Sequence, residues 1–200
     1  MGWNFYNASG ELQINDGGLQ AGSAVFTGKV DLGSNLLVGN AGSTGIAISA
    51  NGEVTMAAQP AVYAYNSVND DDVTGDNTQV RVDFDTEVYD QNGDFSNDVF
   101  TAPVTGRYLF TVTIRLEEYA SGATNEQLSF NSSGSYSFTH YNNFGAWDSL
   151  VTRALAVTLI NHMDAGDTMR IDIAVVGMAK AVDVSGSSAK HTTFGAFLIA

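Results

Sequence analysis

Hydrophobic and polar residues alternate along much of the chain after residue 60, which is the pattern of strands that bury one face. Apolar residues stand at every second position in 79–84, and the longer run 106–116 repeats the pattern. We expect strands at residues 62–65, 79–84, 98–102, 106–116, 127–138, 150–160, 168–176 and 193–199. So many short strands without a convincing helix predict an all-β sandwich or jelly roll.

Residues 150–160 are ambiguous between a strand and a helix, because their apolar residues also fit a helical stripe. The β-branched Val151 and Val157, with flanking threonines, favour a strand buried on both faces. We therefore expect a strand here and keep the helix as the alternative.

The first sixty residues have a different pattern, in which glycines separate short apolar stretches such as 24–26, 36–38 and 46–48. Asn51-Gly52 suits a two-residue type I′ hairpin turn. A narrow ribbon of this kind can bury its apolar face only against copies of itself or a larger surface. We therefore divide the chain at Pro60 into a stalk or attachment segment, 1–60, and a head, 61–200. A flexible tail is the alternative for the first part.

Composition narrows the classes of partner and chemistry. The chain has 8 basic and 22 acidic residues, so its net charge of −14 disfavours a nucleic-acid partner. The absence of cysteine excludes disulfides and thiolate chemistry, which leaves packing or oligomerisation as the source of stability. We expect no membrane span, because no apolar run approaches ~20 residues. The N-terminus does not read as a secretory signal.

One segment carries a specific resemblance. The spacing from Phe84 through Asp90 and Phe95, followed by Phe100-Thr101-Ala102-Pro103-Val104-Thr105-Gly106-Arg107-Tyr108-Leu109-Phe110, is similar to the signature of the complement C1q globular-head family. Its matching positions here are Phe84, Asp90, Phe95, Phe100, Gly106, Tyr108 and Phe110. The turn at 164–167 and the ending at 194–199 fit the same family. The gap between Phe95 and Phe100 is two residues shorter than usual.

The physical interpretation of these residues agrees with the resemblance. Tyr108 and Phe110 alternate along one strand, so both rings are expected in the core. Pro103 constrains the turn, and Gly106 is expected to supply a positive φ. The resemblance itself implies a ten-stranded C1q/TNF-like jelly roll that forms a homotrimer and binds partners through exposed loops. No collagen repeat precedes the head.

Candidate site residues fall in two places. Asp70, Asp71, Asp72 and Asp76 concentrate oxygen ligands that suit calcium, although they lack EF-hand spacing, and a solvated acidic loop over 69–77 is the alternative. The resemblance allows calcium too, since the family includes calcium-binding heads; no other cofactor is expected.

The second candidate lies between two strands. Asn142, Asn143, Phe144 and Trp147 form a polar and aromatic stretch suited to binding a sugar or protein, with packing of Trp147 as the alternative. His140, His162 and His191 lie far apart and are expected at the surface or in turns.

Motifs for a hydrolase elbow, a zinc protease or a phosphate loop are absent from the sequence, so we expect a binding protein rather than an enzyme. The first segment, in which glycines separate short apolar stretches, is similar in composition to segments of phage fibres and appendages. The preferred hypothesis is a bacteriophage virion protein: residues 1–60 contact other virion proteins, and the head recognises a host surface glycan or protein. The alternative is a secreted, extracellular C1q-like lectin or cytokine-like binding protein.

Overall fold

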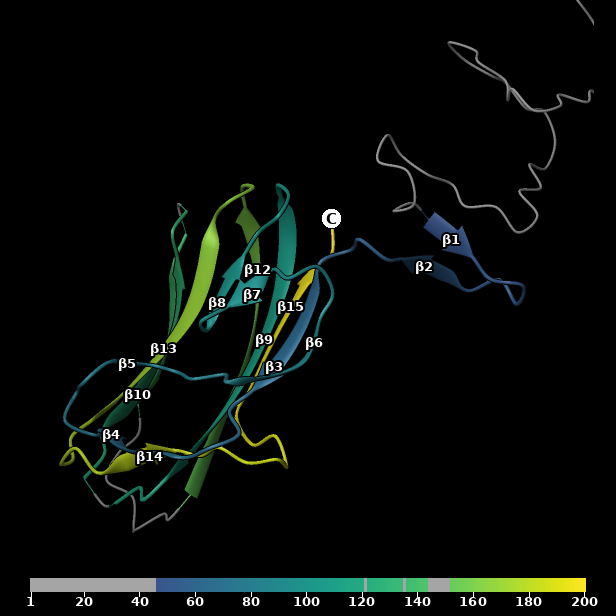
Figure 1. The fold of residues 1–200 in the computed structure, drawn as a ribbon. Coiled ribbons are helices and arrows are strands. Elements are labelled where there is room, and N and C mark those ends of the chain that lie inside the picture. Colours follow the sequence, from purple (N-terminus) through teal and green to yellow (C-terminus); the bar gives the residue numbers. More distant parts are fainter. Residues whose placement is uncertain (1–45, 121, 135, 144–151) are drawn as a thin grey trace, which may run out of the picture.

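Two antiparallel β-sheets face each other in the head, as the ribbon in Figure 1 shows. The computed structural model describes residues 46–120, 122–134, 136–143 and 152–200, and no helix occurs among them. The seven-stranded sheet has the order β4-β14-β9-β15-β3-β6, with β12 also paired to β9. Its strands are β3 (Ala61–Tyr65), β4 (Asp70–Thr74), β6 (Thr86–Asp90), β9 (Gly106–Glu117), β12 (Thr152–Met163), β14 (Val182–Val184) and β15 (Thr193–Leu198).

The six-stranded sheet has the order β11-β10-β13-β8-β7, and β5 pairs with β13 outside that path. Its strands are β5 (Val80–Arg81), β7 (Phe95–Ser96), β8 (Val99–Thr101), β10 (Asn125–Ser132), β11 (Phe138–Asn143) and β13 (Thr168–Val176). With the short β4, β5 and β14 included, the described residues form more than the ten strands that the resemblance implies.

The core between the sheets is a cluster of aromatic rings. Phe110 on β9 lies 5.7 Å from Phe100 on β8 and 6.1 Å from Phe194 on β15, measured between ring centroids. Tyr108 is also fully buried, and its hydroxyl donates a hydrogen bond of 2.6 Å to the Val104 carbonyl. The alternation of apolar residues along β9 therefore places both rings inside, and the buried phenol keeps a polar partner.

Two positions of the signature stabilise turns. Asp90 accepts hydrogen bonds from the backbone amides of Gly93, Asp94 and Phe95, at 3.1, 3.0 and 2.9 Å, so its carboxylate organises the turn before β7. Gly106 does not have the positive φ we expected. Instead, a Cβ atom there would lie 2.6 Å from the Leu198 side chain, so glycine is needed for close approach of the C-terminal strand.

Several of the strand and loop boundaries expected from the sequence were wrong. Residues 69–77 are not one loop, because β4 occupies much of that stretch and pairs with β14. The run 127–138 is divided into β10 and β11 by a turn. Within residues 79–84 only Val80 and Arg81 form a strand, and the Val82 amide donates one further hydrogen bond of 3.0 Å to the Ile171 carbonyl on β13. Val82 and Phe84 are buried, as the alternation requires.

The strand expected at 150–160 is present as β12, which extends from Thr152 to Met163. It is not buried on both faces, because its burial pattern alternates and Ile160 is 58% exposed. Residues 150 and 151 lie outside the described part of the chain.

The hairpin ahead of the head is formed by β1 (Ile46–Ile48) and β2 (Val54–Met56). Its connection is not the expected type I′ turn: Ile48 pairs with Val54, so residues 49–53 form the loop, and only Gly52 has a positive φ, of 94°. The linker after β2 is fastened to the head, because Gln91 Nε2 donates to the carbonyls of Met56 and Ala57 at 3.0 and 2.8 Å. In Figure 1 this hairpin lies at the end of the head that carries the C-terminus. The rest of the segment, residues 1–45, lies outside the described residues.

Candidate functional site

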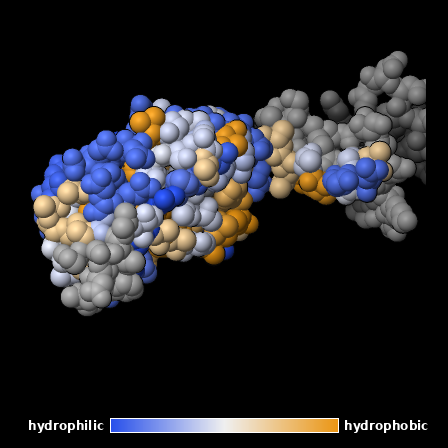
Figure 2. Space-filling view, turned by 90° about the horizontal axis from the view of Figure 1, so that it is seen from below, coloured by the Kyte–Doolittle hydropathy of each residue, from blue (hydrophilic) through white to orange (hydrophobic). Residues whose placement is uncertain are grey.

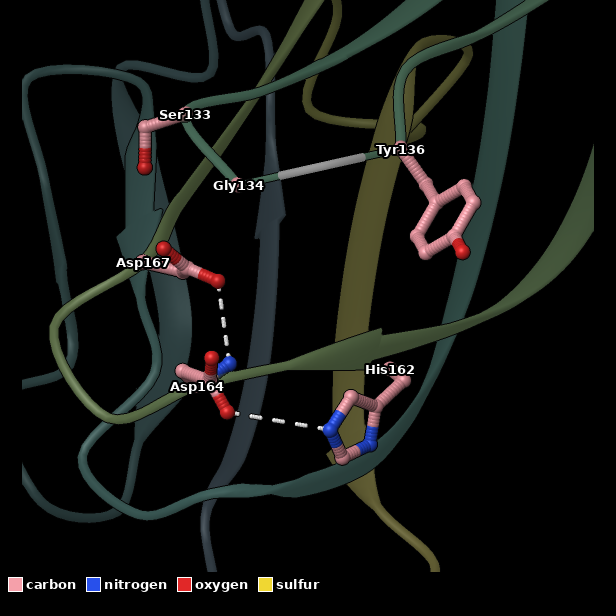
Figure 3. Close-up of a pocket in the computed structure, with 6 residues that line it drawn as sticks. All are labelled: Ser133, Gly134, Tyr136, His162, Asp164 and Asp167. Atoms are coloured by element: carbon pink, nitrogen blue, oxygen red, sulfur yellow. Dashed lines mark hydrogen bonds and ion pairs between the residues drawn. The ribbon is translucent and has the colours of Figure 1, made fainter.

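A pocket of about 440 Å³ opens between two turns of the head, one joining β10 to β11 and the other joining β12 to β13. It is lined by Ser133, Gly134, Tyr136, His162, Asp164 and Asp167. In Figure 3 the rings of Tyr136 and His162 lie on one side of the opening, and the two carboxylates lie on the other. An aromatic ring therefore faces hydrogen-bond acceptors across a hollow.

Backbone and side-chain hydrogen bonds join the two turns. The Thr168 amide donates to Ser133 Oγ at 2.8 Å, and the Ser133 amide donates to the Thr168 carbonyl at 3.0 Å. The buried Asn161 donates from Nδ2 to the Tyr136 carbonyl at 3.1 Å. The pocket thus has a preformed wall, a feature of sites that bind small ligands without large rearrangement.

Gly134 packs closely against the wall of the pocket. A Cβ atom at Gly134 would lie 2.4 Å from Asp167 Oδ2, so a larger residue there would push that carboxylate away from the first turn. Asp167 in turn accepts a hydrogen bond of 2.9 Å from the Asp164 amide. One oxygen of this carboxylate is therefore used to shape the second turn.

The imidazole and carboxylate groups at the mouth are solvated. His162 Nε2 lies 3.7 Å from Asp164 Oδ1, and their side chains are 58% and 77% exposed. A pair this exposed contributes little to stability, so both groups remain free to bind a ligand. Tyr136 is 68% exposed. An exposed ring beside carboxylates and hydroxyls suits a saccharide, whose C–H face packs on the ring while its hydroxyls donate to the carboxylates.

The expected binding stretch is only partly described. Asn142 and Asn143 end β11, and Asn142 Nδ2 lies 3.4 Å from Glu126 Oε2, so this amide contacts a buried carboxylate. Phe144 and Trp147 lie outside the described residues. The sequence alone does not bring the lining of this pocket together, because its two turns are about thirty residues apart; it points only to the 164–167 turn and to His162 as a surface residue.

The calcium candidates are not gathered around one point. Asp71 and Asp72 are exposed on β4. Hydrogen bonds from the Thr78 side chain and from the Thr78 amide, the latter of 3.0 Å, lower the pKa of Asp76. No group of three or more histidine or acidic side chains in the described residues is placed to hold a metal ion. Calcium binding stays a prediction without geometric support.

Asp70 belongs instead to a second acidic cluster with Asp83, Asp85 and Asp98. Partial burial, with repulsion from Asp98 and a hydrogen bond to it, raises the pKa of Asp83 to about 6. Asp98 Oδ1 already accepts a hydrogen bond of 2.9 Å from the Phe84 amide. Near neutral pH, ionised Asp83 therefore faces a carboxylate that cannot move away.

We expect Asp83→Asn to raise the free energy of unfolding by about 1 kcal/mol at pH 7.5, after allowance for solvent screening. Because the folded-state pKa exceeds the unfolded value, this aspartate stabilises the fold below pH ~4 and loses that contribution as pH rises through about 6. The gain should therefore vanish at pH 4 in melting experiments. The asparagine amide can still donate a hydrogen bond to Asp98, and it does not become charged as pH rises.

Asp85→Asn is the matched control. Burial opposes ionisation of Asp85, but hydrogen bonds from Ser67 and Thr86 outweigh it and lower its pKa. This substitution should destabilise the head at pH 7.5 by about 1 kcal/mol. If both variants shift stability in the same direction, the opposed roles assigned to the two carboxylates are wrong.

No family model matches the chain, and no curated protein matches it. Among solved structures it is similar to the globular domain of zebrafish complement 1qA protein, with a TM-score of 0.50 and 22% identity over 71% of this chain and 98% of that domain. The head has a C1q-like jelly-roll fold. Murine APRIL is also similar, in structures at pH 5.0 and 8.5, with TM-scores of 0.49 and 0.47 and identities of 14% and 15%. Each comparison covers 70% of this chain and 99% of the APRIL chain.

At these identities the likeness shows the fold alone. Among the described residues no helix is long and apolar enough to cross a bilayer.

Proposed function

We propose that the protein is a structural component of a bacteriophage particle, such as a fibre, knob or head or tail appendage, whose homotrimeric C1q-like head binds a ligand on the host surface. Residues 1–60 contact other virion proteins in this proposal. Its main support is an uncovered apolar face on a C1q-like head that also carries a preformed pocket. The glycine-punctuated first segment is the support for a particle.

The apolar face follows from strand register on the outer side of the seven-stranded sheet. Ala61 pairs with Phe197, Phe197 with Leu109, and Leu109 with Ile160, so four apolar residues form one row across β3, β15, β9 and β12. Tyr63 and Tyr89 lie in the neighbouring row, with ring centroids 6.1 Å apart. Nothing in the described residues covers Ile160, which is 58% exposed.

Such a face favours association between copies of the chain, because burying it removes apolar surface from water. Figure 2 shows hydrophobic residues gathered on the side of the head nearest the β1–β2 hairpin, while much of the opposite side is hydrophilic. A closed threefold arrangement would cover the same patch on every copy and leave none exposed.

We expect light scattering of the purified chain to give about three times its 21.1 kDa mass. Leu109→Glu should convert the trimer to monomers, because it places a charge in the middle of the apolar row. Val68→Glu is the matched control, since Val68 is 65% exposed in a loop away from that row, and it should leave the mass unchanged. A monomeric parent protein would reject the trimer.

Particle membership can be tested with antibodies against the purified chain. On phage particles from a culture that carries the gene, immunogold labelling should mark one type of structure, and the purified head should compete with particle adsorption. Protein found only free in the medium would contradict the proposal and support the secreted lectin-like or cytokine-like alternative. Capsid, portal or tail genes beside this gene would agree with the virion assignment.

A further inference from the structure

A second cavity, of about 410 Å³, adjoins the pocket of Figure 3 on the outer side of the six-stranded sheet. The two cavities share Ser133 in the β10–β11 turn. Two arginines, Arg81 and Arg170, line the second cavity. Most of its remaining polar wall consists of three hydroxyls and one amide, those of Ser132, Ser137, Thr168 and Asn131. This composition offers many donors to a ligand.

The two guanidinium groups are unusual in this chain, which has only 8 basic residues against 22 acidic ones. Arg170 on β13 lies opposite Asn131 on β10, and Arg81 on β5 pairs with Asp172, two residues further along β13. Strand register therefore places both arginines on the same part of the sheet. Because arginine keeps its charge at all ordinary pH values, this region stays positive.

One buried carboxylate orients this region without cancelling its charge. Asp172 is 5% exposed; its Oδ2 accepts a 2.9 Å hydrogen bond from Asn131 Nδ2 and lies 3.3 Å from Arg170 Nη2. Arg81 Nη1 lies 3.4 Å from the Asn97 carbonyl, which restrains its direction. Of these two arginines, only Arg170 forms an ion pair with a carboxylate among the described residues, so the guanidinium of Arg81 is left to bind an anion.

We propose that the two adjoining pockets bind one acidic saccharide. Its carboxylate or sulfate group is held by Arg81 and Arg170, and a neighbouring sugar ring packs against Tyr136. Guanidinium groups bind such anions through paired, charge-assisted hydrogen bonds. This inference rests on the proposed binding function and names the class of ligand for that site.

The rest of the site argues against other anions. Asp164 and Asp167 in the adjoining pocket would repel a second negative charge close to the first. The net charge of −14 likewise repels nucleic acids and other dense polyanions. A ligand with one anionic group beside neutral, hydroxyl-bearing rings satisfies both pockets, because its hydroxyls can donate to the two carboxylates.

Calorimetry on the full chain can test this with sialyllactose and a monosulfated disaccharide, each beside its uncharged form: lactose or the desulfated sugar. We expect at least one acidic member to bind, and its neutral form to bind at least about tenfold more weakly. Arg81→Gln and Arg170→Gln should each weaken that binding by about tenfold, and Tyr136→Ala should weaken acidic and neutral forms alike. Arg107→Gln removes the same charge outside both pockets and should have no effect.

Inorganic sulfate and single-stranded DNA serve as further probes. Sulfate alone should compete only weakly, and DNA should not bind. The inference is overturned if no acidic sugar binds better than its neutral form, if DNA binds as well as the sugar, or if the arginine variants keep full affinity. The trimer mass and the labelling of particles do not depend on these arginines, so those measurements show separately whether the proposed function fails.

Discussion

Replacing Phe110 with alanine is expected to lower the free energy of unfolding of the head by about 3–5 kcal/mol. The ring is completely buried and connects the two sheets, since its neighbours Phe100 and Phe194 come from β8 and β15. Removing it leaves a cavity between sheets whose strands cannot move together freely. A loss of this size is a large part of the 5–15 kcal/mol typical of a folded domain.

The measurement is chemical or thermal unfolding at one fixed protein concentration, because association adds to apparent stability. Phe110→Leu keeps most of the volume and should cost about 1–2 kcal/mol. Phe138→Ala removes the same ring from an edge strand where it is 42% exposed, so its cost should stay below about 1 kcal/mol. Equal losses for Phe110→Ala and Phe138→Ala would show that the ring cluster is not what holds the sheets together.

The central part of the fold could be predicted because its signal is local. Tyr108 and Phe110 alternate on one strand, and both have zero exposure. In residues 79–84 the same alternation correctly indicates that Val82 and Phe84 are buried, yet only Val80 and Arg81 form a strand. Side-chain periodicity reports burial, whereas strand pairing depends on partners that are distant in sequence.

Strands whose residues are typical of loops could not be predicted from the sequence. Strand β4 contains Asp70, Asp71 and Asp72, a run that looks like a solvated loop, and it becomes a strand because β14 offers an edge to pair with. The turn between β10 and β11 was hidden in a continuous β-rich run. Tertiary pairing decides both cases, and a single sequence does not display it.

The residues of the candidate site are likewise brought together by tertiary pairing, which the sequence does not display. Tyr136 lies in the β10–β11 turn and His162 lies near the end of β12, and they line one pocket only because β10 and β12 belong to sheets that face each other. Arg81 and Arg170 are separated by most of the head in sequence and share a cavity through β5 pairing with β13. Residues that are distant in sequence and meet only through the fold have no local motif by which they could be recognised.

The other large effect is expected at Arg153, where substitution by leucine should cost about 3–5 kcal/mol. Arg153 on β12 forms an ion pair with Glu126 on β10, and the pair bridges the two sheets. The Glu126 side chain has no exposed surface, and burial raises its pKa even though Arg153 and a hydrogen bond with Tyr119 act in the opposite direction. Without the guanidinium, the carboxylate must ionise in the interior or remain protonated.

The loss of stability in Arg153→Leu should depend on pH. A folded-state pKa above the unfolded value means that the protonated glutamic acid stabilises the fold at low pH, and that this contribution disappears as pH rises through the folded-state pKa. Removing Arg153 raises that pKa further, so Arg153→Leu should be much less destabilising at pH 5 than at pH 8. Unfolding curves at the two pH values measure the difference.

A double-mutant cycle separates the ion pair from the packing of the arginine stem. Glu126→Gln removes the buried charge and keeps the shape, so adding Arg153→Leu to it should cost less than half of what the same change costs in the parent protein. Arg153 itself is 17% exposed and can turn its charge toward water, which keeps the cost of Glu126→Gln alone near 1–2 kcal/mol. An identical cost of Arg153→Leu in both backgrounds, or no change between pH 5 and pH 8, would mean that the arginine stabilises the head by contacts other than its charge.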